Sequence, residues 1–168
     1  KIYALRKGES RDSLEHIGTI MFKVFDRLNE LANSDSAIPG LSTGLRDLDA
    51  KINGLNKSDL LLVAARPAMG KSAFALNIAL NVAKKYKKTV ALFNLEMSRE
   101  QLVMRLLANE SFVDGKKLAT GKLTEEEWTK ISMAGASLSQ TDIRIDDNPS
   151  ITVAEMNAKL RRLDNLGL

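Results

Sequence analysis

An apolar run that ends in a glycine, a lysine and a serine constrains this chain more than any other stretch. Residues 60–65 read Leu-Leu-Leu-Val-Ala-Ala, and residues 66–72 read Arg-Pro-Ala-Met-Gly-Lys-Ser. The first part is typical of a short buried strand, and the apolar residues after Ser72 predict a helix. A strand, a tight loop and a helix that opens with Lys-Ser form the arrangement of a phosphate-binding P-loop. We therefore predict that this loop holds the phosphates of a nucleotide.

Each part of the loop has a chemical task. Backbone N–H groups would face the phosphates, and the positive end of the helix dipole would add to the same site. Lys71 would lie near the β- and γ-phosphates, and the Ser72 hydroxyl would be a ligand of Mg²⁺. The predicted nucleotide-binding residues are Ala65, Arg66, Pro67, Ala68, Met69, Gly70, Lys71 and Ser72. Ala65 stands where the usual motif has its first glycine, and an ordinary strand-to-helix turn with an exposed lysine is the alternative.

Composition excludes several other classes of protein. The chain has 168 residues, of which 44% are hydrophobic, enough for one sizeable core. It has no cysteine, which excludes a disulfide framework and thiolate metal sites. No apolar run approaches the roughly 20 residues of a membrane span, and the first residues do not resemble a secretion leader, so we expect a cytoplasmic location. The net charge of +4 is compatible with a polyanion partner but does not imply one.

An amphipathic helix is predicted over residues 14–31, with Asp12 as N-cap and Glu15 in a capping box. Its apolar residues repeat at intervals of three and four along one face: Leu14, Ile17, Met21, Val24, Phe25, Leu28 and Leu31. His16 lies off that face, where we expect a solvated side chain. The residues after the helix, 33–40, are typical of a linker. The helix could pack on its own domain or in a groove of a neighbouring subunit, and these residues favour neither.

The rest of the chain alternates between helix and strand patterns. Further helices are expected over 45–54, after Ser72, after the capping boxes at Ser98 and Thr124, and over 152–163. Strands are expected over 60–65, 89–95 and 142–147, and residues 166–168 resemble the start of another. A helix between the strands 60–65 and 89–95 implies a right-handed crossover. We therefore predict an α/β fold with a mainly parallel sheet flanked by helices.

Three acidic residues compete for catalytic and metal-binding roles. Glu96 directly follows the strand 89–95, so it should lie at the same edge of the sheet as the loop. There it could orient the water that attacks the γ-phosphate, or it could merely favour the N-terminus of the next helix. Asp146 and Asp147 also end a strand, but that strand is only half apolar. We interpret them as turn residues before Asn148-Pro149 rather than as magnesium ligands.

Several motifs in order resemble DnaB-type hexameric replicative helicases. The strongest are residues 64–79, which include the Gly70-Lys71-Ser72 loop, and residues 92–98, Leu-Phe-Asn-Leu-Glu-Met-Ser. Weaker ones also match: Gln101-Leu102, Arg105, residues 120–123, residues 145–150 and residues 161–163. The resemblance covers the chain from about residue 12 to its end. Ala65 in place of glycine is familiar in this family.

The resemblance implies a RecA-like motor that hydrolyses ATP at subunit interfaces and moves single-stranded DNA through a ring of six identical subunits. It assigns phosphate and Mg²⁺ to Lys71 and Ser72, and it makes Glu96 the catalytic base with Lys71 as its catalytic partner. It implies a flexible segment and linker helix over 1–35, which docks on the adjacent subunit, and part of the motor domain over 36–168. It also implies contacts with primase and a helicase loader, and no membrane.

The resemblance further implies that some machinery lies outside this sequence. In the family, the magnesium aspartate, the DNA-binding loops and the arginine finger follow Leu168, and a collar domain precedes Lys1. We therefore expect this chain alone to bind ATP without unwinding DNA. Two other functions stay open: a subunit-interaction module whose P-loop is idle, and a P-loop kinase. No cluster of arginines typical of a kinase lid is seen in the sequence.

Overall fold

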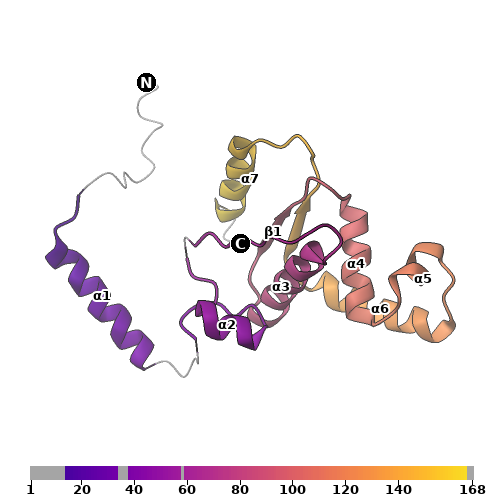
Figure 1. The fold of residues 1–168 in the computed structure, drawn as a ribbon, viewed down its shortest axis with the longest axis horizontal. Helices are drawn as coiled ribbons and strands as arrows, with labels where there is room; N and C mark the ends of the chain where they lie inside the picture. The colour runs from indigo at the N-terminus through magenta and orange to yellow at the C-terminus, as the bar shows by residue number, and fades with distance from the viewer. Residues whose placement is uncertain (1–13, 34–37, 58, 166–168) are drawn as a thin grey trace. The chain divides into compact units, whose positions relative to one another are not determined.

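The computed structural model describes residues 14–33, 38–57 and 59–165. It divides the chain into two compact units, Lys1–Pro39 and Gly40–Leu168, which are treated separately below (Figure 1). The predicted domain boundary between residues 35 and 36 lies outside the described residues, as does the strand predicted to start near residue 166. None of the described helices is long and apolar enough to cross a membrane.

The first unit contains a single described helix, α1, Ile17–Ala32. It begins later than predicted because His16, not Asp12, is its N-cap: the Nδ1 atom of His16 accepts a hydrogen bond from the backbone N–H of Gly18 at 3.1 Å. Asp12 lies outside the described residues. Glu15 precedes the helix and accepts from the Lys23 ammonium at 2.9 Å, so the capping box predicted for Glu15 is wrong.

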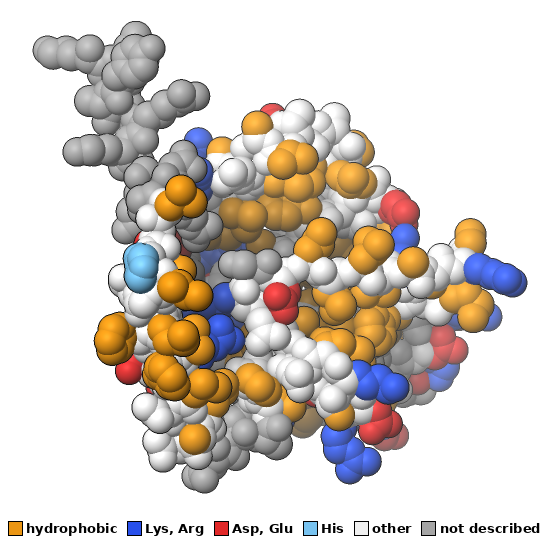
Figure 2. All heavy atoms as spheres, turned by 60° about the vertical axis from the view of Figure 1, so that its left-hand side comes forward, with side chains coloured by type: hydrophobic (Ala, Val, Ile, Leu, Met, Phe, Trp, Pro, Cys, Tyr) orange, Lys and Arg blue, Asp and Glu red, His pale blue; other side chains and the backbone are white. Residues whose placement is uncertain are grey.

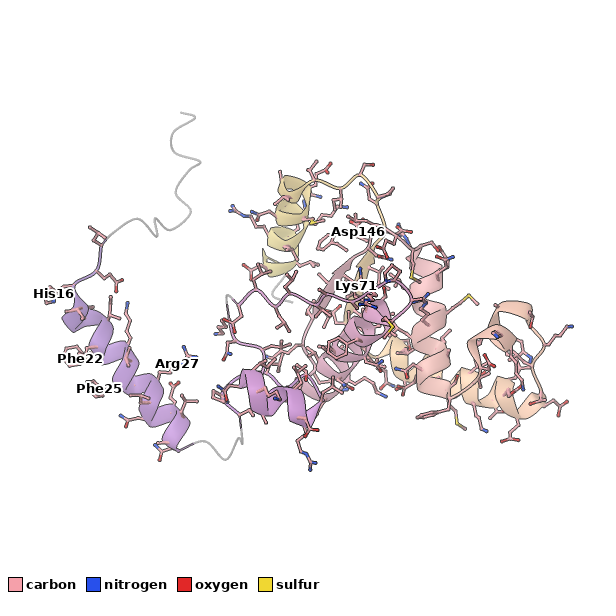
Figure 3. All side chains as sticks on the ribbon, in the orientation of Figure 1. His16, Phe22, Phe25, Arg27, Lys71 and Asp146 are labelled. Carbon is pink, nitrogen blue, oxygen red and sulfur yellow. The ribbon has the colours of Figure 1, made fainter. Side chains whose placement is uncertain are left out.

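One face of α1 carries most of its large apolar side chains, as the spacing predicted. No residue of the helix is buried, and Phe25 is 57% exposed. Figure 2 shows these side chains gathered along the helix near the pale-blue His16. In Figure 3, Phe22 and Phe25 leave one side of α1 and Arg27 leaves the other. Within its own unit, this helix therefore has an apolar surface without a partner among the described residues.

The second unit is built on two parallel strands, β1 (Val90–Phe93) and β2 (Ile143–Asp146). The register places Val90 opposite Ile143 and Phe93 opposite Asp146. The parallel arrangement is confirmed, but the predicted strand over 60–65 is wrong. Those residues belong to no strand or helix, and all are exposed. A strand needs a neighbour for its N–H and C=O groups, and no described strand lies against this segment.

The described residues of the second unit also form six helices: α2 (Arg46–Ile52), α3 (Lys71–Tyr86), α4 (Arg99–Ser111), α5 (Gly115–Thr120), α6 (Glu125–Ser139) and α7 (Val153–Asn165). The predicted capping boxes of α4 and α6 are confirmed, with Ser98 accepting from the Gln101 N–H and Thr124 from the Glu127 N–H. The short helix α5, capped by Asp114, was not predicted.

The core of this unit lies where α3 and α4 pack together. Four leucines form it, each about 5% exposed or less: Leu76, Leu80, Leu102 and Leu106. Leu92 of β1 and the two isoleucines of β2 pack against them. Burying leucines contributes about 1.5–3 kcal/mol each. The helix that follows the P-loop is therefore fixed firmly against the sheet.

A buried polar cluster holds a second segment to α3. Asp49 of α2 is 5% exposed and accepts hydrogen bonds from the Ser42 hydroxyl at 2.5 Å and from the N–H and hydroxyl of Thr43 at 2.8 and 2.7 Å. The carbonyl of Thr43 in turn accepts from the side-chain amide of Asn81 on α3 at 3.0 Å. This cluster ties residues 42–49 to the helix that begins at the P-loop.

Candidate nucleotide-binding site

The predicted P-loop forms an open, exposed turn at the start of α3. Residues 61–71 are all exposed, and Ser72 is half-buried. Gly70 is the N-cap of α3 at φ +87°, and Ala68 also has positive φ, at +65°. Such left-handed positions turn the chain sharply and aim successive N–H groups at one point. The local geometry is therefore that of an anion cradle.

The N-terminus of α3 has no side-chain cap. The first N–H groups of any helix lack intrahelical acceptors, and here the cap residue is a glycine, which has no side-chain acceptor to offer them. By contrast, side chains cap α4, α5 and α6. A Cβ added to Gly70 would meet no atom within 4 Å, so the space in front of the loop is open. Phosphate oxygens fit a site with free donors, a positive dipole end and this room.

The structure brings Lys71 and Glu96 together although 24 residues separate them in the sequence. The Lys71 Nζ atom lies 4.0 Å from the Glu96 Oε1 atom, and both side chains are largely exposed. Lys71 opens α3, as Figure 3 shows. Glu96 lies in the loop between β1 and α4. Because α3 and β1 share the core, the folding of that core places the two groups side by side. An ammonium and a carboxylate at this spacing suit phosphate binding and activation of a water.

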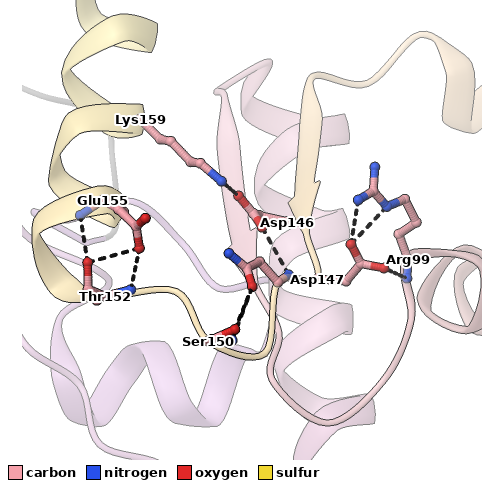
Figure 4. A network of polar contacts seen from close by, with 8 residues as sticks. Arg99, Asp146, Asp147, Ser150, Thr152, Glu155 and Lys159 are labelled. Atoms are coloured by element: carbon pink, nitrogen blue, oxygen red, sulfur yellow. Dashed lines mark hydrogen bonds and ion pairs between the residues drawn. The ribbon is translucent and has the colours of Figure 1, made fainter.

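Asp146 and Asp147 have partners of their own (Figure 4). Asp146 accepts from the Lys159 ammonium of α7, and its Oδ1 atom accepts from the Asn148 N–H at 3.1 Å. These two bonds, that of Lys159 first, hold the pKa of Asp146 below its usual range. The bond to Asn148 is that of a turn residue, as interpreted from the sequence. Both oxygens of the Asp146 carboxylate therefore accept hydrogen bonds from protein groups, which suits a turn residue better than a metal ligand.

Asp147 joins the end of β2 to the start of α4. Its carboxylate accepts from the Arg99 Nε atom at 2.9 Å and from the Arg99 backbone N–H at 3.1 Å. The bond from the Arg99 side chain, and after it the one from the backbone, lowers the pKa of Asp147. Sequence reasoning missed this pair. The only signal was an acidic residue after one strand and an arginine at the start of a helix after the other, 48 positions away.

Metal binding rests on one predicted residue. Among the residues that the structure describes, no three His, Cys, Asp or Glu side chains are grouped so that they could hold a metal ion. Magnesium in nucleotide sites is typically held by one or two protein oxygens together with phosphate and water. The Ser72 hydroxyl, at the second position of α3, fits that kind of site, and its role stays a prediction.

An α/β unit that carries a P-loop at a helix N-terminus, with a carboxylate opposite its lysine, defines the class of P-loop nucleotide-binding proteins. Comparison with known families narrows the class: residues 40–168 match the family described as DnaB-like helicase C terminal domain. This match covers most of the chain, so the chain belongs to the family of DnaB-like helicase C-terminal domains.

Known relatives agree with this family. The chain is 47% identical over 163 residues to the replicative DNA helicase DnaB of Geobacillus stearothermophilus, covering 97% of this chain and 36% of that protein. It is 48% identical over 160 residues to the replicative DNA helicase DnaC of Bacillus subtilis, covering 95% of this chain and 35% of that protein. The chain thus spans about a third of the length of these relatives.

Solved structures show the same fold. The ATPase domain of G40P superposes with a TM-score of 0.82 at 30% identity, over 91% of this chain and 53% of that one. A DnaB-like replicative helicase, solved in a study of its interactions with primase, gives a TM-score of 0.80 at 28% identity, over 98% of this chain and 38% of that one. The predicted RecA-like α/β fold class is confirmed by this likeness.

Proposed function

We propose that this chain is the ATP-binding part of a replicative DNA helicase that couples ATP hydrolysis to the unwinding of duplex DNA. The observation that carries the proposal is the placement of Lys71 at the uncapped N-terminus of α3, 4.0 Å from the carboxylate of Glu96. Family membership supports the same reading. The chain by itself would bind ATP and Mg²⁺, and unwinding belongs to the longer assembly.

The chain's own groups divide the work of hydrolysis. The uncapped N–H groups at the start of α3 and the Lys71 ammonium hold the β- and γ-phosphates. The Ser72 hydroxyl is the protein ligand of Mg²⁺, which neutralises phosphate charge when bound. The Glu96 carboxylate orients a water toward the γ-phosphorus and takes its proton. Since Glu96 is exposed at 71%, nothing within the described unit blocks a water from reaching it.

Thermal unfolding with and without Mg-ATP tests nucleotide binding. A ligand present at 100 times its dissociation constant stabilises the folded state by about 2.7 kcal/mol, so the melting temperature should rise by several degrees. Lys71→Ala should abolish the rise. Glu96→Gln should keep the rise and lose ATP hydrolysis. If Mg-ATP affects the wild-type chain and Lys71→Ala equally, the site does not bind nucleotide through its lysine.

The exposed apolar face of α1 favours a second proposal: the helix docks on another copy of the chain. None of its residues is buried within its own unit, and apolar side chains such as Phe25 contribute hydrophobic stabilisation only if a partner covers them. Sedimentation of the chain with and without residues 1–35 tests this. Phe25→Ser should reduce self-association, whereas Arg27→Ser, on the other side of the helix, should not. The same number of chains per particle in all forms would contradict docking.

The remaining assignments follow from the family and belong to the longer protein. We propose a ring of six identical subunits that holds single-stranded DNA and works with primase and a helicase loader in the cytoplasm. A P-loop kinase is the competing function. Phosphate transfer from ATP to a nucleoside, rather than to water, would identify a kinase and refute the helicase proposal.

A further inference from the structure

The position of the Glu96 carboxylate is decided by its backbone, not by side-chain packing. Its side chain is 71% exposed, and the neighbouring Leu95 is 54% exposed. Within the described residues, the carboxylate has one recorded contact, with the Lys71 ammonium at 4.0 Å. An exposed side chain with a single long contact samples several rotamers, so the region that its carboxylate can reach is set by where the backbone holds the Cα atom. What fixes residues 94–98 therefore decides where the carboxylate can reach.

Asn94 closes this loop on itself. Its backbone N–H donates to the carbonyl of Asp146 at 2.8 Å, which extends the parallel ladder one residue beyond β1. Its side-chain amide donates to the carbonyl of Met97 at 2.8 Å, and its Oδ1 atom accepts from the N–H of Glu96 at 3.4 Å. One half-buried side chain thus bonds both the residue that bears the functional carboxylate and the residue after it.

Asp147 fixes the other end of the loop. The loop ends where α4 begins, at Arg99, and the Asp147 carboxylate holds both the backbone N–H and the guanidinium of that residue (Figure 4). Charge-assisted bonds of this kind are stronger and more directional than neutral ones. Because Asp146 bonds Asn94 and the consecutive Asp147 bonds Arg99, the end of β2 is hydrogen-bonded to the loop on both sides of Glu96.

We propose that Asn94 and the Arg99–Asp147 pair are positioning residues that hold the Glu96 carboxylate opposite Lys71. The inference rests on the proposed function of Glu96 in ATP hydrolysis. Neither Asn94 nor Arg99 belongs to the P-loop; each acts through the backbone of residues 94–98. Replacing either residue should therefore lower the rate of ATP hydrolysis while leaving the affinity of the P-loop for the nucleotide unchanged.

The test compares Asn94→Ala with the wild-type chain in two measurements. The first is ATP hydrolysis: kcat should fall about tenfold to a hundredfold, the range expected for a displacement of about 1 Å, with KM changed less than about twofold. The second is amide hydrogen exchange without nucleotide: the N–H group of Glu96, which donates to Asn94, should exchange about tenfold faster, and those of α3 should not change. Asn157→Ala, an exposed asparagine of α7, is the matched control and should change neither.

The outcomes separate this inference from the proposed function. If the wild-type chain neither binds nor hydrolyses ATP, the proposed function fails, and the exchange measurement still decides whether Asn94 fixes the loop. An unchanged exchange rate at Glu96, an unchanged kcat, or a KM that rises as much as kcat falls would overturn the positioning role. If Asn94→Ala does not fold, Arg99→Gln replaces it, because this side chain is 60% exposed and its loss should leave the core intact.

Discussion

Replacing Asp49 by alanine would remove the acceptor at the centre of the buried cluster that ties residues 42–49 to α3. Three donors lose their partner: the Ser42 hydroxyl, the Thr43 hydroxyl and the Thr43 N–H. Thr43 is fully buried, and Ser42 is 9% exposed, so only the Ser42 hydroxyl can readily turn to water. A buried unsatisfied group costs about 1–3 kcal/mol. Allowing for relaxation, we expect a loss of about 3 kcal/mol, at the upper end for a single substitution.

The carboxylate is also held in its charged form. Burial alone would raise the pKa of Asp49, but the hydrogen bonds from Ser42 and Thr43 outweigh it, and the net effect is a lowered pKa. Its contribution to stability is therefore present above the ordinary pKa near 4 and is lost as the pH falls through the lowered folded value. Unfolding should be measured near pH 7, where the contribution is complete.

Urea unfolding followed by circular dichroism gives the free energy of unfolding of each variant. Asp49→Asn keeps the shape and one acceptor oxygen, so its cost should be smaller, about 1 kcal/mol. Asp47→Ala is the matched control, since this side chain lies on the same helix and is 96% exposed; its effect should stay within about 0.5 kcal/mol. A loss for Asp49→Ala no larger than that for Asp47→Ala would refute the reasoning.

Three further predictions use other parts of the second unit. Gly44→Ala should lower the free energy of unfolding by about 2–3 kcal/mol, because φ is +85° and the new Cβ would lie 2.2 Å from a side-chain nitrogen of α3. Gly121→Ala, with φ +69° and open space, should lower it by about 1 kcal/mol. Equal losses in thermal unfolding would contradict this reasoning. Leu106→Ala, at a site 4% exposed, should cost about 2–5 kcal/mol in urea unfolding, and a cost below 1 kcal/mol would mean that the site is not a packed core. The pKa values of Asp146 and Asp147 are lowered in the folded state, so their charged forms stabilise the fold above about pH 4, and this stabilisation is lost as the pH falls further. The melting temperature should therefore decrease below that pH, and decrease less in Asp147→Asn. A melting temperature constant down to pH 2 would exclude this linkage.

Features that depend on neighbours in the sequence could be predicted well. The capping boxes at Ser98 and Thr124 need only a hydroxyl and a glutamine or glutamate three residues later, and both formed as expected. The start of α3 at Lys71 and the strand around residues 90–93 followed from the apolar pattern in the same way. The start of α1 was wrong by a few residues, since a histidine can cap a helix through its ring nitrogen and the usual preferences for caps do not favour it.

Pairing between strands could not be predicted, because it joins residues that are distant in the sequence. The apolar run 60–65 has every local property of a strand, yet without a neighbour it forms no ladder in the described structure, and β1 pairs with β2 instead. Three helices, α4, α5 and α6, lie between these two strands in the chain, and no local sequence pattern indicates which strand β2 will pair with. The short helix α5 was missed for the related reason that six residues carry too little periodicity to be recognised.

The candidate site shows the same division. The sequence by itself determined that Lys71 and Ser72 open a helix after a glycine-bearing turn, since the turn chemistry and the apolar pattern are local. It also placed Glu96 just after a strand. Only the tertiary structure decided that the Glu96 carboxylate lies 4.0 Å from the Lys71 ammonium, and that Asp147 is hydrogen-bonded to Arg99, which is 48 positions away in the sequence. Those distances depend on how α3, α4 and the two strands pack around four buried leucines, and packing is a property of the whole unit rather than of any segment.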